Sequence, residues 1–340
     1  MVQQEEDHVQ LEAPNDTICL WVELDMHRPY FEGSFRHNSV MMFGETFHCA
    51  ALVALDRRFG VNVVLGKANR ILGDKQYEFI SSVATACDQV SSSQSISVLT
   101  TGPPKIRLDR CTLIIAYSIA ADPSISERIR DLFISGALRL VKHRLPRDVM
   151  WDCLGVDFFK MECPVISLFL RKTLIKNNPE FDTTSLHVQG VIDLVSSLGV
   201  KTLLLCGDRS AYVPSELQHR HLVIIDLLQY YQSPGFLQLL GEVPFSARCL
   251  LQYWLQVIVF VTLGPHSGGT DHCIFVKSKC IVWTSTDHPA HPRMPRLAAA
   301  CADWWKLVPV GETAAISCGF IPEGLRDLTN ALRHWLPLQD

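Results

Sequence analysis

Residues 257–283 read VIVFVTLGPHSGGTDHCIFVKSKCIVW, and this stretch decides the fold class. The apolar run Val257–Leu263 predicts a buried strand, and a second apolar run spans Cys280–Trp283. Between them lie the turn Gly264–Thr270 and a short helix predicted over Asp271–Lys277. A strand, a glycine-rich turn, a helix and a further strand are typical of a parallel sheet covered by helices.

The alternation of strands and helices continues on both sides of this stretch. In the second half we expect strands at Pro164–Leu170, Lys201–Cys206 and His221–Asp226, and helices at Thr183–Leu198, Ala247–Gln256 and Pro322–Leu336. In the first half we expect strands at Ile18–Leu24, Val61–Leu65 and Cys111–Tyr117, and helices at 47–59, 74–90 and 125–143. Gly60 is expected to end the first of these helices, and residues 91–104 to form a surface connection.

Length and composition divide the chain into two domains. A chain of 340 residues is long enough for two domains of about 150 residues each. Hydrophobic residues make up 48% and charged residues 19%, so a sizeable core is expected. The predicted fold is α/β, with two Rossmann-like domains of mostly parallel sheets. We expect a flexible tail over 1–17, an N-terminal domain over 18–160, a C-terminal domain over 161–320 and a terminal helix over 321–340.

Charge, cysteine usage and the N-terminal sequence indicate which partners and which cellular compartment to expect. The net charge is −4 without a dense basic run, which argues against a nucleic-acid partner. The 12 cysteines are scattered, which indicates a reducing compartment. The acidic start does not read as a signal peptide, and Val257–Leu263 is too short to span a bilayer. A cytoplasmic protein without a membrane span is expected, with the Golgi or ER as the alternative if the N-terminus is incomplete.

The turn after the strand at 257–263 has the chemistry of a phosphate site. Glycines let the backbone approach a ligand, hydroxyls donate hydrogen bonds, and the following helix N-terminus attracts anions. The predicted phosphate-binding residues here are His266, Ser267, Gly268, Gly269 and Thr270. The alternative is an ordinary tight turn between a strand and a helix, in which Gly and Ser are also common.

A second candidate follows the strand at 164–170, which ends in two adjacent cations and a hydroxyl. Arg171, Lys172 and Thr173 are predicted to clamp a diphosphate, because an Arg guanidinium binds phosphate oxygens in bidentate fashion. The alternative is a solvated strand end. Asp208 and Arg209 follow the next strand and are predicted to hold a nucleotide, although Gly-Asp is also typical of turns.

The first half holds a third candidate around residues 43–48. Gly44, Glu45, Phe47 and His48 begin a predicted helix, and Glu45 is a candidate catalytic base or a contact to an acceptor sugar. Capping of the helix by Glu45 is the alternative. No metal is expected, because the chain lacks an Asp-x-Asp triplet whose carboxylates could hold a metal ion. No other cofactor is expected. A metal site at Asp287, His288 and His291, and stacking of a sugar on Trp304 and Trp305, are weaker alternatives to a surface loop and to core packing.

Three segments together resemble the fucosyltransferase superfamily of GT-B glycosyltransferases. Residues 41–61 are similar to the family's opening glycine loop and helix, which implies that Gly44, Glu45, Phe47 and His48 lie on the acceptor side. Residues 168–174 resemble its His-x-Arg-Arg-x-Asp peptide, with Arg171 as the first Arg, and 264–270 resemble its late Gly/Ser turn. Phe169, Lys172 and Leu174 depart from this pattern. The turn also resembles that of another GT-B family, which adds xylose or N-acetylglucosamine.

The resemblance implies an architecture and a reaction. The architecture is a pair of domains that face a cleft. The expected reaction is metal-independent, inverting transfer of fucose from GDP-fucose to a glycan or glycoprotein acceptor. Arg171 would contact the donor diphosphate and act in catalysis, and the nucleotide sugar would be a substrate and not a cofactor. The departures from the pattern motivate two alternatives: a degenerate protein that binds nucleotide or glycan or acts as a scaffold, and a GT-B transferase that uses a UDP-sugar.

Overall fold

The structure is a computed structural model, and it describes a part of the chain. The described residues are 18–24, 59–65, 97–99 and 106–107, as backbone only, and 122, 124–140, 161–172, 182–207, 221–227, 258–266, 270, 273–274, 277–287 and 293–336. The helices expected at 74–90 and 247–256, and the strand expected at 111–117, lie outside these residues.

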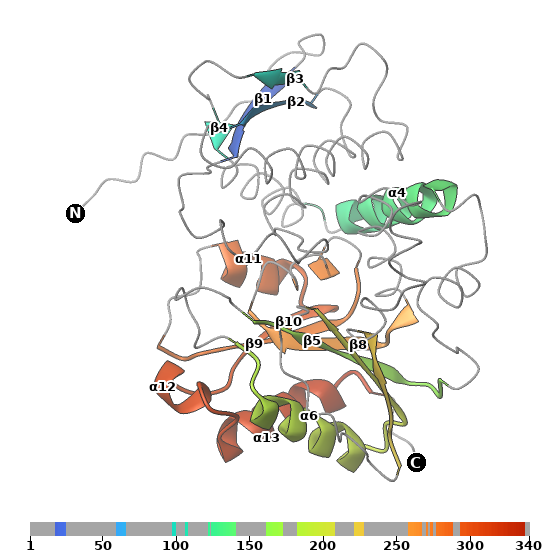
Figure 1. The fold of residues 1–340 in the computed structure, drawn as a ribbon, viewed down its shortest axis with the longest axis vertical. Coiled ribbons are helices and arrows are strands. Elements are labelled where there is room, and N and C mark those ends of the chain that lie inside the picture. The colour runs from blue at the N-terminus through green and yellow to red at the C-terminus, as the bar shows by residue number, and fades with distance from the viewer. Residues whose placement is uncertain are drawn as a thin grey trace.

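The C-terminal half is built on a six-stranded, all-parallel sheet (Figure 1). Its strands are β5 (Val165–Leu170), β6 (Thr202–Gly207), β7 (Val223–Asp226), β8 (Val261–Pro265), β9 (Cys280–Thr284) and β10 (Trp305–Pro309). The spatial order is β10-β9-β8-β5-β6-β7. Numbered along the chain from β5, this is the order 3-2-1-4-5-6 of doubly wound, Rossmann-like folds. The prediction of a mixed α/β fold with a parallel sheet is confirmed.

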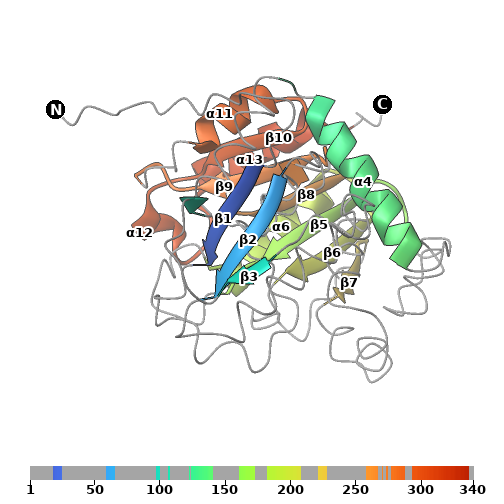
Figure 2. The same ribbon diagram turned by 90° about the horizontal axis from the view of Figure 1, so that it is seen from above.

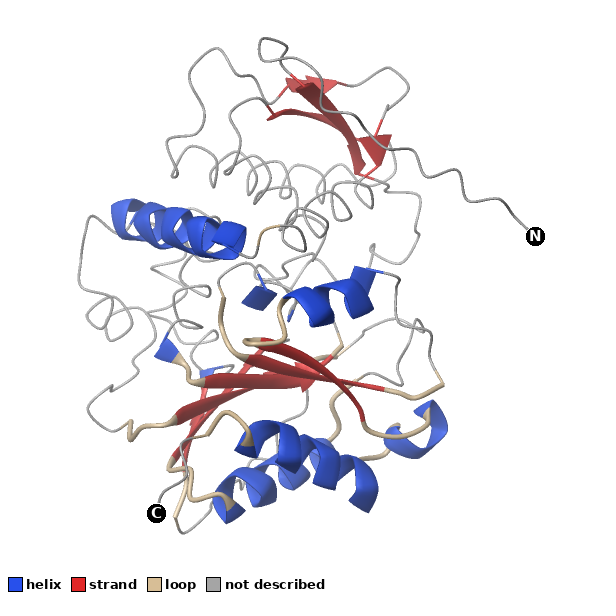
Figure 3. Ribbon diagram, turned by 180° about the vertical axis from the view of Figure 1, so that it is seen from behind, coloured by secondary structure: helices blue, strands red, loops and turns tan. Residues whose placement is uncertain are grey.

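Helices cover both faces of this sheet, which explains why its strands are apolar along their length. Figure 3 shows α6 (Ser185–Ser197) and α13 (Pro322–Arg333) on one face and α11 (Arg293–Ala300) on the other. Alternate residues of β5 pack into the core with α6 and α13. The residues of this core that β5 supplies are Ile166, Leu168 and Leu170, all 0% exposed. Burial on both faces removes the polar alternation of a half-exposed strand.

Helix α6, at Ser185–Ser197, lies within the range 183–198 predicted for it. Thr184 is its N-cap, and a capping box joins Thr184 to His187 three residues later. Gly199, two residues after the helix, has φ = 74°, a conformation that favours glycine. α13 begins with Pro322 at its first turn, where the missing N–H costs nothing. Its Gly324 contacts the Val310 backbone, where a side chain would clash.

The first half contributes a separate four-stranded parallel sheet (Figure 2). Its strands are β1 (Ile18–Leu24), β2 (Phe59–Leu65), β3 (Ser97–Leu99) and β4 (Ile106–Arg107), in the order β3-β2-β1-β4. Figure 1 draws helix α4 (Ser124–Leu140) between this sheet and the six-stranded one. Glu127 of α4 forms an ion pair with Lys277, which follows β8 in the chain, so α4 contacts the C-terminal half.

Several predicted boundaries are wrong. Gly60 does not cap a helix, because β2 already begins at Phe59. The Ser-rich stretch 91–104 contains strand β3. Strand β8 begins at Val261, four residues later than predicted, and it includes Gly264 and Pro265, which were assigned to the turn. Strand β10 and helices α11 and α12 (Thr313–Ile316) were not predicted. Among the described residues, no helix is long and apolar enough to cross a membrane.

Candidate functional site

The site lies at the carboxyl ends of β5 and β8, the neighbouring strands where the chain order of the sheet reverses. Doubly wound sheets bind ligands at this switch point. Arg171 is the first residue after β5, and His266 is the first residue after β8. The Arg171 guanidinium donates a hydrogen bond from Nη1 to the His266 carbonyl, at 3.3 Å. The fold therefore joins two of the predicted phosphate-binding segments, which are 95 residues apart in sequence.

The backbone of Arg171 is held by a residue that sequence reasoning missed. The Arg171 N–H donates to the Thr183 hydroxyl at 2.9 Å. In return the Thr183 N–H donates to the Arg171 carbonyl at 2.8 Å. Thr183 is buried, with 4% of its surface exposed. Its partner is 12 residues away, so no local pattern identifies it.

Lys172 is paired with a carboxylate in the structure. Its Nζ lies 3.9 Å from Oδ2 of Asp182, and the two side chains are 44% and 7% exposed. Asp182 is thus a second polar residue at this edge that the sequence did not suggest. A diphosphate at Lys172 would share the ammonium group with this carboxylate.

The turn after β8 is anchored by a hydrogen bond from a side chain to its own backbone. The Thr270 hydroxyl donates to the Pro265 carbonyl at 3.4 Å, and Thr270 is 0% exposed. This hydroxyl therefore stabilises the turn. Gly264 lies inside β8, where a Cβ atom would come within 2.9 Å of Thr270 Cγ2 and 3.0 Å of Phe169 Cβ. The assignment of Gly264 to the phosphate turn is corrected: its small size lets β8 pack against its neighbours.

Strand β9 brings one more polar side chain to the same edge. The parallel register pairs Pro265 with Trp283, and the His266 N–H donates to the Trp283 carbonyl at 2.9 Å. The next residue of β9, Thr284, therefore lies level with His266. Thr284 is 5% exposed, and its hydroxyl has no hydrogen-bond partner in the part of the chain that the structure describes.

The N-terminus of α6, which also follows β5, is closed by its own residues. The Thr184 side chain accepts a hydrogen bond from the His187 N–H, and His187 Nδ1 accepts one from the Thr184 N–H. His187 stacks on Trp283 at a centroid distance of 6.0 Å and meets the edge of Phe320 at 4.8 Å. Burial lowers the pKa of His187 to about 4, so its ring is neutral at pH 7.

The Cys206 thiol, which lies near this edge, is unreactive. Burial raises the pKa of the Cys206 thiol, in β6, to about 12, so this thiol stays protonated. Gly207 ends β6 opposite Leu170, with φ = 109°. Within the described residues, no group of three or more His, Cys, Asp and Glu side chains is placed to hold a metal ion.

The weaker sequence alternatives have structural explanations. Asp287 accepts hydrogen bonds from the backbone N–H and the hydroxyl of Thr313, which lower the pKa of the Asp287 carboxyl. It anchors the start of α12 in this way. Trp304 is 4% exposed and donates to the Ile274 carbonyl at 3.3 Å, while Trp305 is 0% exposed within β10. The packing interpretation of both tryptophans is confirmed.

The remaining predicted site residues lie outside the part of the chain that the structure describes. They are Gly44, Glu45, Phe47, His48, Thr173, Asp208, Arg209, Ser267, Gly268 and Gly269, together with His288 and His291. Their roles stay predictions. No protein-family model matches the chain, and neither a curated protein nor a solved structure does.

Proposed function

We propose that the chain binds the diphosphate of a nucleotide sugar at the carboxyl edge of the six-stranded sheet and transfers the sugar to an acceptor. The observation that carries this proposal is the 3.3 Å hydrogen bond from Arg171 to the His266 carbonyl at the switch point. It brings a guanidinium group next to a turn whose sequence favours an anion, at the place where doubly wound sheets bind ligands.

The chemistry assigned to these residues is electrostatic. When the bond between a sugar and a nucleotide diphosphate breaks, negative charge grows on the leaving diphosphate. A fixed guanidinium group stabilises that charge, and its planar fork matches two phosphate oxygens. Lys172 adds a second cation, shared with Asp182. Backbone N–H groups of the 266–270 turn would complete the diphosphate site, with Asp208 and Arg209 holding the nucleotide.

The resemblance supplies the reaction class. We propose an inverting, metal-independent glycosyltransferase of GT-B architecture that moves fucose from GDP-fucose to a glycan or glycoprotein. The four-stranded sheet would belong to the acceptor domain, with the Gly44–His48 segment facing the acceptor. Glu45 is the proposed base. The two parallel sheets, each with strand order compatible with a Rossmann-like domain, support this arrangement.

A second candidate function is nucleotide binding without turnover. The observation that favours it is Phe169, which stands where the resembled family has a His. Its Cβ lies 3.0 Å from the place that a Cβ at Gly264 would occupy, so this side chain belongs to the packing between β5 and β8. A protein that kept Arg171 while losing that His would bind the donor and fail to use it.

Titration calorimetry with GDP, UDP and ADP in the presence of EDTA tests the proposal. We expect GDP to bind, and we expect Arg171→Ala to weaken binding about 10- to 100-fold, the loss typical of a charge-assisted hydrogen bond. Arg326→Ala on α13 is the matched control, because that Arg is exposed on a helix that packs against β9, β10 and α6.

Each outcome selects among the candidates. Release of GDP from GDP-fucose, lost in Arg171→Ala, would support the transferase. GDP binding without release would favour the binding protein, and preference for UDP would redirect the donor to a UDP-sugar. Failure of all three nucleotides to bind, or equal binding by Arg171→Ala, would overturn the diphosphate site.

A further inference from the structure

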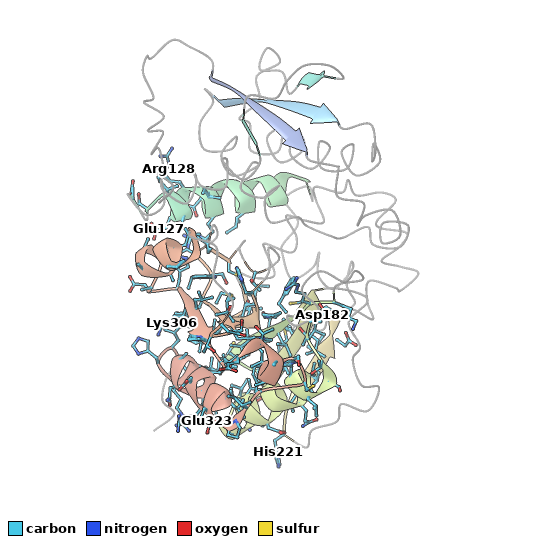
Figure 4. All side chains as sticks on the ribbon, turned by 90° about the vertical axis from the view of Figure 1, so that its left-hand side faces the viewer. Glu127, Arg128, Asp182, His221, Lys306 and Glu323 are labelled. Atoms are coloured by element: carbon cyan, nitrogen blue, oxygen red, sulfur yellow. The ribbon has the colours of Figure 1, made fainter. Side chains whose placement is uncertain are left out.

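Two buried polar residues contact Arg171 and Lys172, the residues just beyond the end of β5. Asp182 and Thr183 precede α6 and are 6% and 4% exposed, although Asp and Thr usually lie at the surface. They return the chain to the level of Arg171 and Lys172. Figure 4 labels Asp182, whose ion pair with Lys172 places it at the carboxyl edge of the sheet, where β5 ends.

Thr183 bonds to both sides of the Arg171 backbone. Its hydroxyl accepts the Arg171 N–H at 2.9 Å, and its own N–H donates to the Arg171 carbonyl at 2.8 Å. This pair replaces the sheet hydrogen bonds that end with β5 at Leu170. The φ and ψ angles of Arg171 are thereby fixed from both directions. The guanidinium end is held separately, by the His266 carbonyl at 3.3 Å.

An arginine held at both ends loses little freedom when it binds a ligand. The Arg side chain has one of the largest rotamer entropies, and ordering it on binding lowers affinity. The ion pair between Asp182 and the neighbouring Lys172, at 3.9 Å, ties the same stretch of chain a second time. Asp182 and Thr183 therefore hold Lys172 and Arg171 in place before a ligand binds.

We infer that Thr183 is a positioning residue that fixes Arg171 for diphosphate binding. This inference rests on the proposed function, since it concerns the same site. Thr183 contacts the Arg171 backbone and acts on the ligand through Arg171. It belongs to the first loop after β5, so the N-terminus of α6 would serve the site through this bond and not by binding the anion itself.

The chain offers a matched control for the hydrogen bond. The hydroxyl of Thr202, at the start of β6, accepts the Glu162 N–H at 2.9 Å, and Thr202 is 0% exposed. Thr202→Val and Thr183→Val thus each remove one buried hydroxyl that accepts a backbone N–H. They differ in place, since Thr202 lies at the amino end of the sheet and Thr183 at the carboxyl edge. Thr183→Ser keeps the hydroxyl and serves as the rescue variant.

The experiment measures GDP affinity and the mobility of the Arg171 side chain. The ¹⁵N relaxation of the Arg171 Nε–H group, assigned by its loss in Arg171→Lys, reports the mobility without ligand. We expect Thr183→Val to make this group mobile and to weaken GDP binding about tenfold, the effect of about one hydrogen bond. Thr183→Ser and Thr202→Val should leave both unchanged, and Thr183→Val should add nothing in the Arg171→Ala background.

The readouts separate this inference from the proposed function. If the unaltered chain does not bind GDP, the proposed function fails, and the relaxation of Nε still decides whether Thr183 fixes Arg171. An Arg171 side chain as rigid in Thr183→Val as in the unaltered chain would overturn the inference. Equal losses of GDP affinity in Thr183→Val and Thr202→Val would also overturn it, because the effect would then be general destabilisation.

Discussion

At the scale of single residues, the candidate site depends on side chains that hold the backbone as much as on cations. The sequence predicts Arg171 as a site residue because it ends an apolar strand, and His266 because it lies in the glycine-rich turn that follows another. Such residues meet at one edge when the strands are parallel and adjacent. Thr183 was not identified, because its bond to Arg171 is set by the path of a loop. A hydroxyl that serves tertiary structure looks like any other Thr in a sequence.

Gly264 shows why glycine is ambiguous in a sequence. The sequence places it in a turn, where glycine would let the backbone approach a phosphate, yet it lies in β8. Its missing side chain lets β8 pack closely against Phe169 and Thr270. The same residue type thus serves backbone freedom in one place and close packing in another, and only the neighbours tell which.

The Gly264→Ala variant tests the packing role. The added Cβ would lie 2.9 Å from Thr270 Cγ2 and 3.0 Å from Phe169 Cβ, closer than carbon atoms normally approach. We expect a loss of about 1–3 kcal/mol in the free energy of unfolding, as for other overpacked cores. Thr270→Ser removes Cγ2 and should recover a part of that loss in the double variant. Urea denaturation measures both, and an unchanged midpoint for Gly264→Ala would refute the packing account.

At the scale of elements, α6 links the stability of the fold to pH. His187 Nδ1 accepts the N-cap N–H, which requires an unprotonated Nδ1, and the ring is buried against Trp283. Protonation would break the capping box and place a cation at a helix N-terminus, where the dipole opposes it. Burial is the main reason that the pKa falls to about 4 from the ordinary value of 6.5.

The sign of the pH effect follows from that shift. Between pH 6.5 and about 4 the unfolded chain binds a proton at His187 and the folded chain does not, so acid favours unfolding. The contribution is complete above pH 6.5, and up to about 3 kcal/mol is lost as pH falls through the folded pKa. His187→Gln keeps a capping-box residue without titration. The midpoint of thermal unfolding should fall less steeply between pH 7 and 4.5 in this variant than in the unaltered chain. Parallel pH profiles of the two midpoints would contradict the assignment of this pH dependence to His187.

The elements that were predicted share long apolar runs, and those that were missed do not. Strands β5, β6 and β9 are buried on both faces, so each reads as a continuous apolar segment. Strand β10 reads WKLVP, with a Lys and a Pro, because it lies at an edge of the sheet. Its Lys306 lies over the Trp335 ring at 4.7 Å, a contact that composition does not reveal. Strand β3, three residues long in a Ser-rich stretch, gave no signal.

At the scale of the whole molecule, the site follows from the order of the strands. β5 and β8 are neighbours although β6 and β7 separate them in the chain, and doubly wound sheets bind ligands beyond the carboxyl ends of such a pair of strands. The sequence predicted alternating strands and helices and thus a parallel sheet. The strand order, which decides which loops meet, depends on long-range pairing and could not be derived from it.

Hydrogen exchange of the full chain, followed by mass spectrometry with and without saturating GDP, tests whether a diphosphate binds at the switch point between β5 and β8. If the diphosphate lies at the switch point, peptides that cover 165–172 and 261–270 will both gain protection, and the α13 peptide, which covers one face of the sheet, will not. The same two peptides should lose this protection in Arg171→Ala. Protection confined to other segments, or the same pattern in Arg171→Ala, would contradict a diphosphate site built by Arg171 and the turn at His266.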